Sequence, residues 1–338
     1  MAPQMSGQGL QIFTEALRRC AARTADPELP ALADAVAAPL RIDVRGRRGV
    51  GGRRVVAALR ADGHLIGPAG ASGTSGADVR LYVLAEVCKP EDRRALADGA
   101  DLIVLNKSDL AGLADGGPMR RARRHAAGLS AAVGIPVVPF VAPAALAAAD
   151  PAVLDDDLLA ALRTLVTAPA QWTSADDFVT APHPVPAAER RRLLAALELF
   201  GVAHAVVALR EAPEATPADL RALLAAASGL TELRAAIMAA GAEARYRRVV
   251  AACDTLTVRA TTDPAIAELL AGDDVALARM GAAREVVAAA GADAPHGTGL
   301  RTALHWRRYA AGPVSPLHRD CGLDIARGTL RRLAGARP

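Results

Sequence analysis

Aromatic residues make up only 3% of this 338-residue sequence, and its 40 basic residues include just two lysines, Lys89 and Lys107. A core with so few rings must be built from alanine, leucine and valine, which favours helices and argues against an all-β sandwich. The four cysteines lie far apart and include no C-x-x-C pair. That spacing fits neither a zinc site nor a disulfide framework. A G-x-S-x-G nucleophile elbow is also absent from the sequence.

The rest of the composition is that of a folded protein. With 52% hydrophobic and 22% charged residues the chain can fill a large core, and its length suggests two domains. A net charge of +4 permits anionic partners without requiring them. The first residues do not form a basic segment followed by a long apolar one, so we expect no secretory signal. The expected location is the cytoplasm, with peripheral contact at the inner face of the membrane as a further expectation.

One charge-free stretch, residues 126–149, is long enough to span a bilayer. Pro136, Pro139 and Pro143 interrupt it, however, and unsatisfied backbone groups are costly in lipid. We therefore interpret the stretch as a helix, a turn and a buried strand.

Short apolar strands alternate with helical patterns over the first half of the chain. This alternation predicts an α/β fold with a reduced parallel sheet and helices on both faces. Residues 1–38 are expected to be helices that pack on a helical bundle, residues 39–168 the sheet domain, and residues 169–338 a helical domain. The expected strands cover 39–46, 64–66, 79–87, 101–110 and 135–141.

A glycine-rich turn lies between an expected strand and an expected helix, in Gly46-Arg-Arg-Gly49-Val-Gly51-Gly52-Arg53. The spacing of Gly46 and Gly51 is that of a phosphate-binding loop, GxxxxGK[ST]. Such glycines let successive backbone N–H groups turn toward a phosphate, and the helix N-terminus adds partial positive charge. The alternative is an ordinary glycine turn with solvated arginines.

A second motif, Asn106-Lys107-Ser108-Asp109, follows an apolar strand. In an NKxD motif the carboxylate accepts hydrogen bonds from N1–H and the N2 amino group of guanine, a donor pair that adenine lacks. The asparagine bonds the base and braces the loop, and the lysine stem covers the ring. A lysine here is notable in a chain that otherwise uses arginine. The alternative is a polar turn in which Asp109 caps a helix.

Together these segments resemble the opening of bacterial dynamin-like GTPases, with helices before the glycine loop and a helical region after the sheet domain. The resemblance covers roughly residues 10–141. It implies a P-loop GTPase-like fold, with Gly46, Gly49, Gly51, Gly52 and Arg53 at the phosphate site. It likewise places Asn106, Lys107 and Asp109 at the base site. The family's third base-site element, a Ser-Ala pair, is represented only by Ala142, between Val141 and Pro143.

The departures from the family's pattern bear on catalysis. Gly52 stands where the phosphate-binding lysine belongs, and Arg53 where a hydroxyl would ligate Mg²⁺. The interval of about twenty residues after the loop helix is too short for ordinary switch segments. Thr74 is a weak candidate for the switch threonine and Asp78 for the switch aspartate. Hydrolysis would lose most of its charge stabilisation, so we expect neither a catalytic residue nor a magnesium ion.

These observations predict a pseudo-GTPase that binds GTP or GDP weakly or not at all and acts on a protein partner. That partner would be an active GTPase or a second copy of the chain. Arg48 or Arg53 could still hold a diphosphate, because a guanidinium binds phosphate in a bidentate way. The alternative is a slow dynamin-like GTPase that remodels membranes. Nucleic acid is not expected as a partner: the arginine cluster at 120–125 has no interleaved aromatic residues and is interpreted as a solvated helix face.

Overall fold

A computed structural model describes residues 8–67, 76–112, 116–292, 297 and 299–335. The chain forms two compact units, here called the sheet unit and the bundle unit. The sheet unit comprises Leu40–Ile237, and the bundle unit combines Met1–Pro39 with Met238–Pro338. Residues 169–237 were expected in the helical domain, but their contacts assign them to the sheet unit.

The described part of the sheet unit contains five parallel strands in the order β2-β1-β3-β4-β5. They are β1 (Arg41–Gly46), β2 (Leu65–Ile66), β3 (Val79–Ala85), β4 (Leu102–Asn106) and β5 (Val137–Pro139). Every residue of β4 is buried, as is nearly all of β3. Central parallel strands are covered on both faces, which explains their uninterrupted apolar sequences. The predicted α/β fold with a small parallel sheet is thus confirmed.

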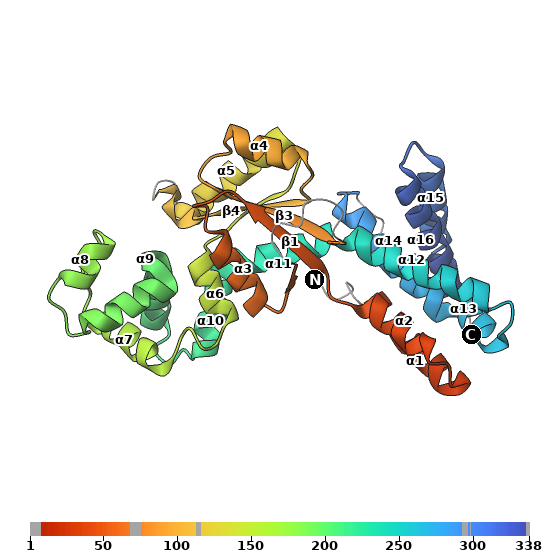
Figure 1. The fold of residues 1–338 in the computed structure, drawn as a ribbon, viewed down its shortest axis with the longest axis horizontal. Coiled ribbons are helices and arrows are strands. Elements are labelled where there is room, and N and C mark those ends of the chain that lie inside the picture. The colour runs from red at the N-terminus through yellow and green to blue at the C-terminus, as the bar shows by residue number, and fades with distance from the viewer. Residues whose placement is uncertain (1–7, 68–75, 113–115, 293–296, 298, 336–338) are drawn as a thin grey trace. The chain divides into compact units, whose positions relative to one another are not determined.

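Helices surround this sheet and extend beyond it. They are α3 (Gly52–Ala61), α4 (Pro90–Ala97), α5 (Pro118–Val133), α6 (Ala142–Ala149), α7 (Asp156–Thr167), α8 (Ala175–Thr180), α9 (Ala187–Glu211), α10 (Pro217–Ala227) and α11 (Leu230–Ala240), with a 3₁₀ turn η2 (Ser108–Ala111). In Figure 1, α4 and α5 lie on one face of the sheet, and α3 and α6 on the other. Tyr82, Leu84, Ile103 and Leu105 pack on the first face in one apolar cluster with residues of α4 and α5.

The charge-free stretch 126–149 forms the end of α5, the strand β5 and the helix α6. The helix, turn and buried strand were expected, whereas α6 was not. Pro143 lies in the first turn of α6, where proline needs no hydrogen-bond partner, and the alanines that follow are strong helix formers. This proline therefore marks the beginning of a helix.

The segment 169–237 belongs with the sheet for identifiable reasons. Ser228, in the turn between α10 and α11, accepts a hydrogen bond from the backbone N–H of Val141 at 2.9 Å. A Cβ on Gly229 would lie 2.2 Å from the carbonyl oxygen of Pro139, so the backbone passes β5 too closely for any side chain. The Arg234 Nε of α11 also donates to Asp62, at the end of α3, at 2.9 Å.

Among the described helices, α9 alone is long and apolar enough to cross a membrane. Core helices of water-soluble proteins pass the same test. In the sheet unit, Leu193, Leu197 and Val202 of α9 are fully buried in an apolar cluster with residues of α7 and α10. The buried residues of α9 thus contribute to this core.

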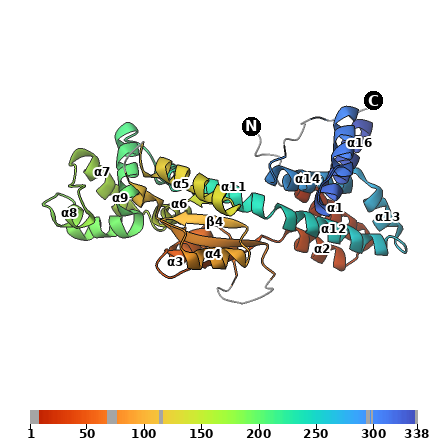
Figure 2. The same ribbon diagram turned by 90° about the horizontal axis from the view of Figure 1, so that it is seen from above.

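The bundle unit is built from both ends of the chain (Figure 2). Its helices are α1 (Gln8–Thr24), α2 (Glu28–Ala37), α12 (Ala242–Arg259), α13 (Pro264–Ala271), α14 (Asp273–Ala289), α15 (Leu300–Ala311) and α16 (Pro316–Gly335), joined by the end of α11. Phe13 and Leu17 of α1 share one core cluster with Trp306 and Ile325, and none of the four is more than 1% exposed. The N-terminal helices therefore pack on the C-terminal ones.

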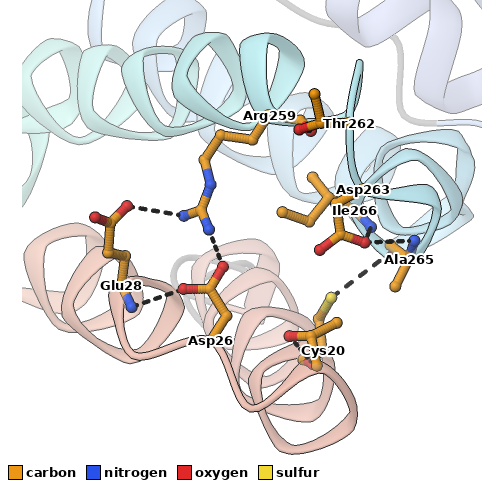
Figure 3. A network of polar contacts seen from close by, with 9 residues as sticks. Cys20, Asp26, Glu28, Arg259, Thr262, Asp263, Ala265 and Ile266 are labelled. Carbon is orange, nitrogen blue, oxygen red and sulfur yellow. Dashed lines mark hydrogen bonds and ion pairs between the residues drawn. The ribbon is translucent and has the colours of Figure 1, made fainter.

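Polar contacts at the rim of this core also tie the two ends of the chain together (Figure 3). The guanidinium of Arg259, in α12, pairs with Asp26 and with Glu28, which precede and begin α2. Nearby, the Cys20 thiol of α1 lies 3.8 Å from the carbonyl oxygen of Ala265 in α13. Sequence-distant helices are thereby fixed by both packing and charge.

One carboxylate lies inside the bundle unit. Asp324, in α16, is 2% exposed and accepts hydrogen bonds from the Tyr246 hydroxyl at 2.8 Å, Arg279 Nε at 2.9 Å and Arg327 Nη1 at 3.0 Å. Burial, followed by the charge and hydrogen bond of Asp324, raises the pKa of Tyr246 well above its usual range. These contacts join α12, α14 and α16.

Candidate functional site

The candidate site lies at the carboxyl edge of the parallel sheet. Gly46 pairs with Val83 in the register of β1 and β3, and Ala85 pairs with Asn106 in that of β3 and β4. The loops that follow these strands consequently emerge on the same side. Ligands of open parallel sheets bind at this edge.

The glycine-rich segment forms the predicted link between a strand and a helix: β1 ends at Gly46 and α3 begins at Gly52. A Cβ on Gly46 would lie 2.8 Å from the Val83 carbonyl oxygen. Gly51 caps α3 with φ +83°, and a Cβ there would lie 2.4 Å from the Asn106 amide nitrogen. Both positions require glycine. At Gly52, by contrast, a Cβ would meet no described atom within 4 Å.

Asn106 connects three of the loops at this edge. Its Nδ2 donates to the Val50 carbonyl oxygen in the glycine loop at 2.9 Å, and its Oδ1 accepts from the Ala142 backbone N–H at 3.2 Å. The side chain is buried, so both bonds are shielded from water. The two bonds join the glycine loop to the start of α6, as a side chain that braces the loop would. Ala142, which matched the family's pattern poorly in sequence, is brought to the site by the same side chain.

The rest of the second motif forms a tight turn. Lys107 has left-handed backbone angles (φ +59°), and the Ser108 hydroxyl donates to the Leu105 carbonyl oxygen at 2.7 Å. Asp109 lies within η2 and does not cap a helix, so the alternative interpretation of this residue is not supported. The turn presents Lys107 and Asp109 at the mouth of one cavity.

That cavity has a volume of about 770 Å³, lies wholly within the sheet unit and is bordered by both predicted motifs. Its lining residues are Gly46, Arg47, Arg48, Gly49, Gly51, Gly52, Arg53, Arg54, Asn106, Lys107, Asp109, Pro143 and Glu198. All eight residues predicted from the sequence are among them. The structure therefore brings the two motifs to a single hollow of the size that small-molecule ligands occupy.

The arginines of this cavity differ in what they contact. Arg47 Nε donates to the buried carboxylate of Asp92 at 3.2 Å, and Arg54 Nη1 pairs with Glu198 Oε1 at 2.6 Å. Among the described residues, neither Arg48 nor Arg53 has a hydrogen bond or an ion pair. Two guanidinium groups beside the glycine loop thus carry uncompensated positive charge, which favours an anionic ligand.

Glu198 was not predicted. It lies inside α9 but has φ +54° and ψ 177°, angles that interrupt the helix. This region of backbone space is occupied almost only by glycine and costs another residue about 1–3 kcal/mol. One sequence signal exists: within the run 193–209 Glu198 is the single acidic or basic residue apart from His204.

Glu198 affects the electrostatics of the predicted base site. Burial, and then the negative charge of Glu198, raise the pKa of Asp109 to about 6, while Lys107 acts in the opposite direction. A carboxyl group so perturbed, at the mouth of a cavity, is a common property of functional sites. Asp109 therefore changes its protonation state close to neutral pH.

Backbone strain is concentrated at the same edge. In the described chain four residues other than glycine have positive φ, and three of them, Glu86, Lys107 and Glu198, border this cavity or the adjacent one. The adjacent cavity measures about 440 Å³ and shares Lys107. Strained residues cluster where function constrains the backbone. This distribution supports the choice of site independently of the motifs.

The weaker sequence candidates lie elsewhere. Thr74 is outside the described residues. Asp78 accepts a hydrogen bond from the Arg41 backbone N–H at 2.7 Å, which places it at the amino end of β1, opposite the site. Within the described ranges, no group of three histidine, cysteine, aspartate or glutamate side chains is arranged to hold a metal ion. Arg123, in the 120–125 cluster, forms an ion pair with Glu232.

Comparison of the chain with family models, curated proteins and solved structures gives no match. The function must therefore be inferred from the chemistry of this cavity.

Proposed function

We propose that the sheet unit is a degenerate P-loop GTPase-like domain that binds a guanine nucleotide weakly and does not hydrolyse it. The observation that carries this proposal is the position of Asn106. Its hydrogen bonds to Val50 and Ala142 hold the glycine loop and the base-binding turn around one cavity. These two bonds support the interpretation of the two motifs as parts of one site.

The base side of the cavity supports a preference for guanine. Asp109 offers two carboxylate oxygens at the mouth of the cavity, and guanine supplies two adjacent donors that adenine lacks. The Lys107 stem, two residues before Asp109 on the border of the same cavity, would cover a bound ring. Ionised Asp109 is the acceptor, so guanine binding requires its proton to leave.

The phosphate side supports binding without catalysis. The first backbone N–H groups of α3 and the guanidinium groups of Arg48 and Arg53 can attract phosphate oxygens. Gly52 and Arg53 supply neither the ammonium that contacts the β- and γ-phosphates nor the hydroxyl that ligates Mg²⁺. A diphosphate free of Mg²⁺ is accordingly the expected ligand. A domain with these properties would act by contact with a protein partner, either an active GTPase or a second copy.

The direct test is titration of the purified chain with fluorescent GDP, GTP and ADP, each with Mg²⁺ and with EDTA, together with an assay of phosphate release. We expect micromolar or weaker binding, GDP preferred to ADP, little dependence on Mg²⁺ and no turnover. Equal affinity for GDP and ADP would refute the proposed base site. Mg²⁺-dependent release of phosphate would instead support the slow GTPase.

A further inference from the structure

The break in α9 lies directly at the candidate cavity. Glu198 leaves the helical conformation, and its carboxylate binds Arg54, which follows the glycine loop in α3. Arg54 would otherwise be free to contact an anionic ligand in that cavity. The carboxylate of Glu198 therefore occupies a position beside Arg54 where a phosphate oxygen could bind. The two residues are 144 positions apart in the sequence.

The residues next to the break are adapted to it. A Cβ on Gly201 would lie 2.9 Å from the Leu197 Cβ. In an uninterrupted helix, Cβ atoms four residues apart are separated by about 5–6 Å. The close approach is thus a property of the broken conformation, and glycine at 201 permits it. An alanine at this position would conflict with the break and would fit a continuous helix.

The two halves of α9 hold different parts of the sheet unit. In the first half, Arg190 donates to the Phe178 carbonyl oxygen of α8, and Arg192 pairs with Asp155 at the start of α7. In the second half, Gly201 lies against Ala144 of α6, beside the site. A change in the angle between the halves would move α7 and α8 relative to the sheet.

We propose that Glu198 is an internal occupant of the cavity, and that an anionic ligand which takes Arg54 releases it and lets α9 form a continuous helix. The inference rests on the proposed function in one respect only, that this cavity receives a phosphate-bearing ligand. In this mechanism α9 performs the task for which dynamin-like GTPases use switch loops. The interval of about twenty residues between α3 and β3 is too short for such segments.

The physical basis is a difference in free energy between two states. Glu198 keeps its unfavourable backbone angles while its carboxylate is attracted by Arg54. A bound phosphate neutralises Arg54 and repels the carboxylate, which removes the compensation. The helical conformation of Glu198 is then favoured. A ligand shifts such an equilibrium only by its different affinity for the two states, and here only one state leaves Arg54 free.

The conformation of α9 can be measured between spin labels on Arg191→Cys and Val207→Cys, both at exposed positions, in a Cys88→Ser background. The other three cysteines are buried. A straight helix would place these two Cα atoms roughly 24 Å apart, and a bend between the two halves shortens that distance. We expect a short distance in the free protein and a longer one with GDP or inorganic pyrophosphate.

Variants test the mechanism without any ligand. Glu198→Ala and Glu198→Gln remove the carboxylate charge, and Gly201→Ala disfavours the break without touching the cavity. All three should lengthen the distance, and Glu198→Ala should strengthen GDP binding about tenfold, equivalent to about 1.4 kcal/mol. Arg54→Ala should also lengthen the distance but weaken binding. Glu211→Gln, an exposed glutamate at the end of the same helix, is the matched control and should change neither property.

The outcomes separate this inference from the proposed function. If GDP binds but leaves the distance unchanged, α9 is not a switch, although the nucleotide site stands. If pyrophosphate lengthens the distance but GDP and ADP bind equally, the switch stands and the base site fails. If no ligand binds, the variants measured without ligand test the inference. An unchanged distance in Glu198→Ala, in a protein whose circular dichroism shows unchanged helix content, would overturn it.

Discussion

Asp324 in the bundle unit and Asp109 in the sheet unit are both withdrawn from solvent, but their partners differ. Asp324 accepts hydrogen bonds from a tyrosine and two arginines, which satisfy it inside the bundle unit. Asp109 adjoins a second carboxylate, Glu198, which disfavours its charge and raises its pKa to about 6. A carboxylate surrounded by donors stabilises the fold, whereas Asp109 faces a second acid that cannot satisfy its ionised form. The contrast is between a carboxylate that joins three helices and one at the mouth of the candidate cavity.

The largest expected effect follows from removing the satisfied carboxylate. Asp324→Ala leaves Arg279 and the Tyr246 hydroxyl without their partner inside the bundle unit. We expect its free energy of unfolding to fall by about 3–5 kcal/mol. Urea denaturation, followed by Trp306 fluorescence in a Trp172→Phe background, measures this change. Asp320→Ala, an exposed acid on the same helix, is the control. If Asp324→Ala lowers the free energy of unfolding no more than Asp320→Ala does, then Asp324 does not stabilise the bundle unit.

The second effect concerns what the cavity lacks. Gly52→Lys combined with Arg53→Ser restores the ammonium and hydroxyl of a phosphate-binding loop, at a position where a Cβ meets no described atom. We expect the affinity for Mg²⁺-GTP to rise about a hundredfold, or 2.7 kcal/mol, with little change in stability. Calorimetric titration with and without EDTA measures both. A double variant that folds normally but gains no Mg²⁺-dependent affinity would argue against phosphate-loop geometry.

The third effect separates stability from binding. Folding raises the pKa of the Asp109 carboxyl, so ionisation of this group destabilises the native state as pH rises from 4 through 6. Asp109→Asn removes the ionising group. After allowance for solvent screening, we expect the sheet unit to gain about 1 kcal/mol at pH 7.5. The preference for GDP over ADP should disappear. Asp98→Asn, an exposed acid at the end of α4, should leave both unchanged.

The smallest effect is a pH dependence. Because guanine needs the ionised carboxylate of Asp109, the ratio of GDP to ADP affinity should rise from pH 5 to pH 7.5 with a midpoint near 6. The comparison with ADP cancels the titration of the phosphates. Glu198→Gln removes a cause of the raised pKa and should move the midpoint to lower pH. A ratio independent of pH would exclude Asp109 from base recognition.

Local patterns made much of the site predictable. Strand, glycine turn and helix follow one another in sequence, so short-range rules place the end of β1 at Gly46 correctly. The strand expected at 101–110 ends earlier, at Asn106, because Lys107 to Ala111 form a turn. The parallel sheet then brings both ends to one edge. These contacts needed no knowledge of distant packing.

Distant packing determined what the sequence could not reveal. Glu198 borders the cavity only because the packing of α9 brings it there. Neither periodicity nor helix propensity predicts a break at a glutamate followed by Leu-Phe-Gly. Ala142 differs from the expected pair in sequence, but its backbone N–H serves Asn106, and backbone groups carry no residue-specific signal. The segment 169–237 looked helical, as it is, yet helical pattern does not say which core a helix covers.

The assembly of the bundle unit from both ends of the chain has a consequence for synthesis. Phe13 and Leu17 leave the ribosome about 300 residues before Trp306 and Ile325, with which they share a core. At 5–20 residues per second that interval lasts roughly 15–60 s. The sheet unit emerges within it as a continuous segment and can fold, while the apolar face of α1 must wait. Nascent chains of this protein are therefore expected to engage chaperones through their first two helices.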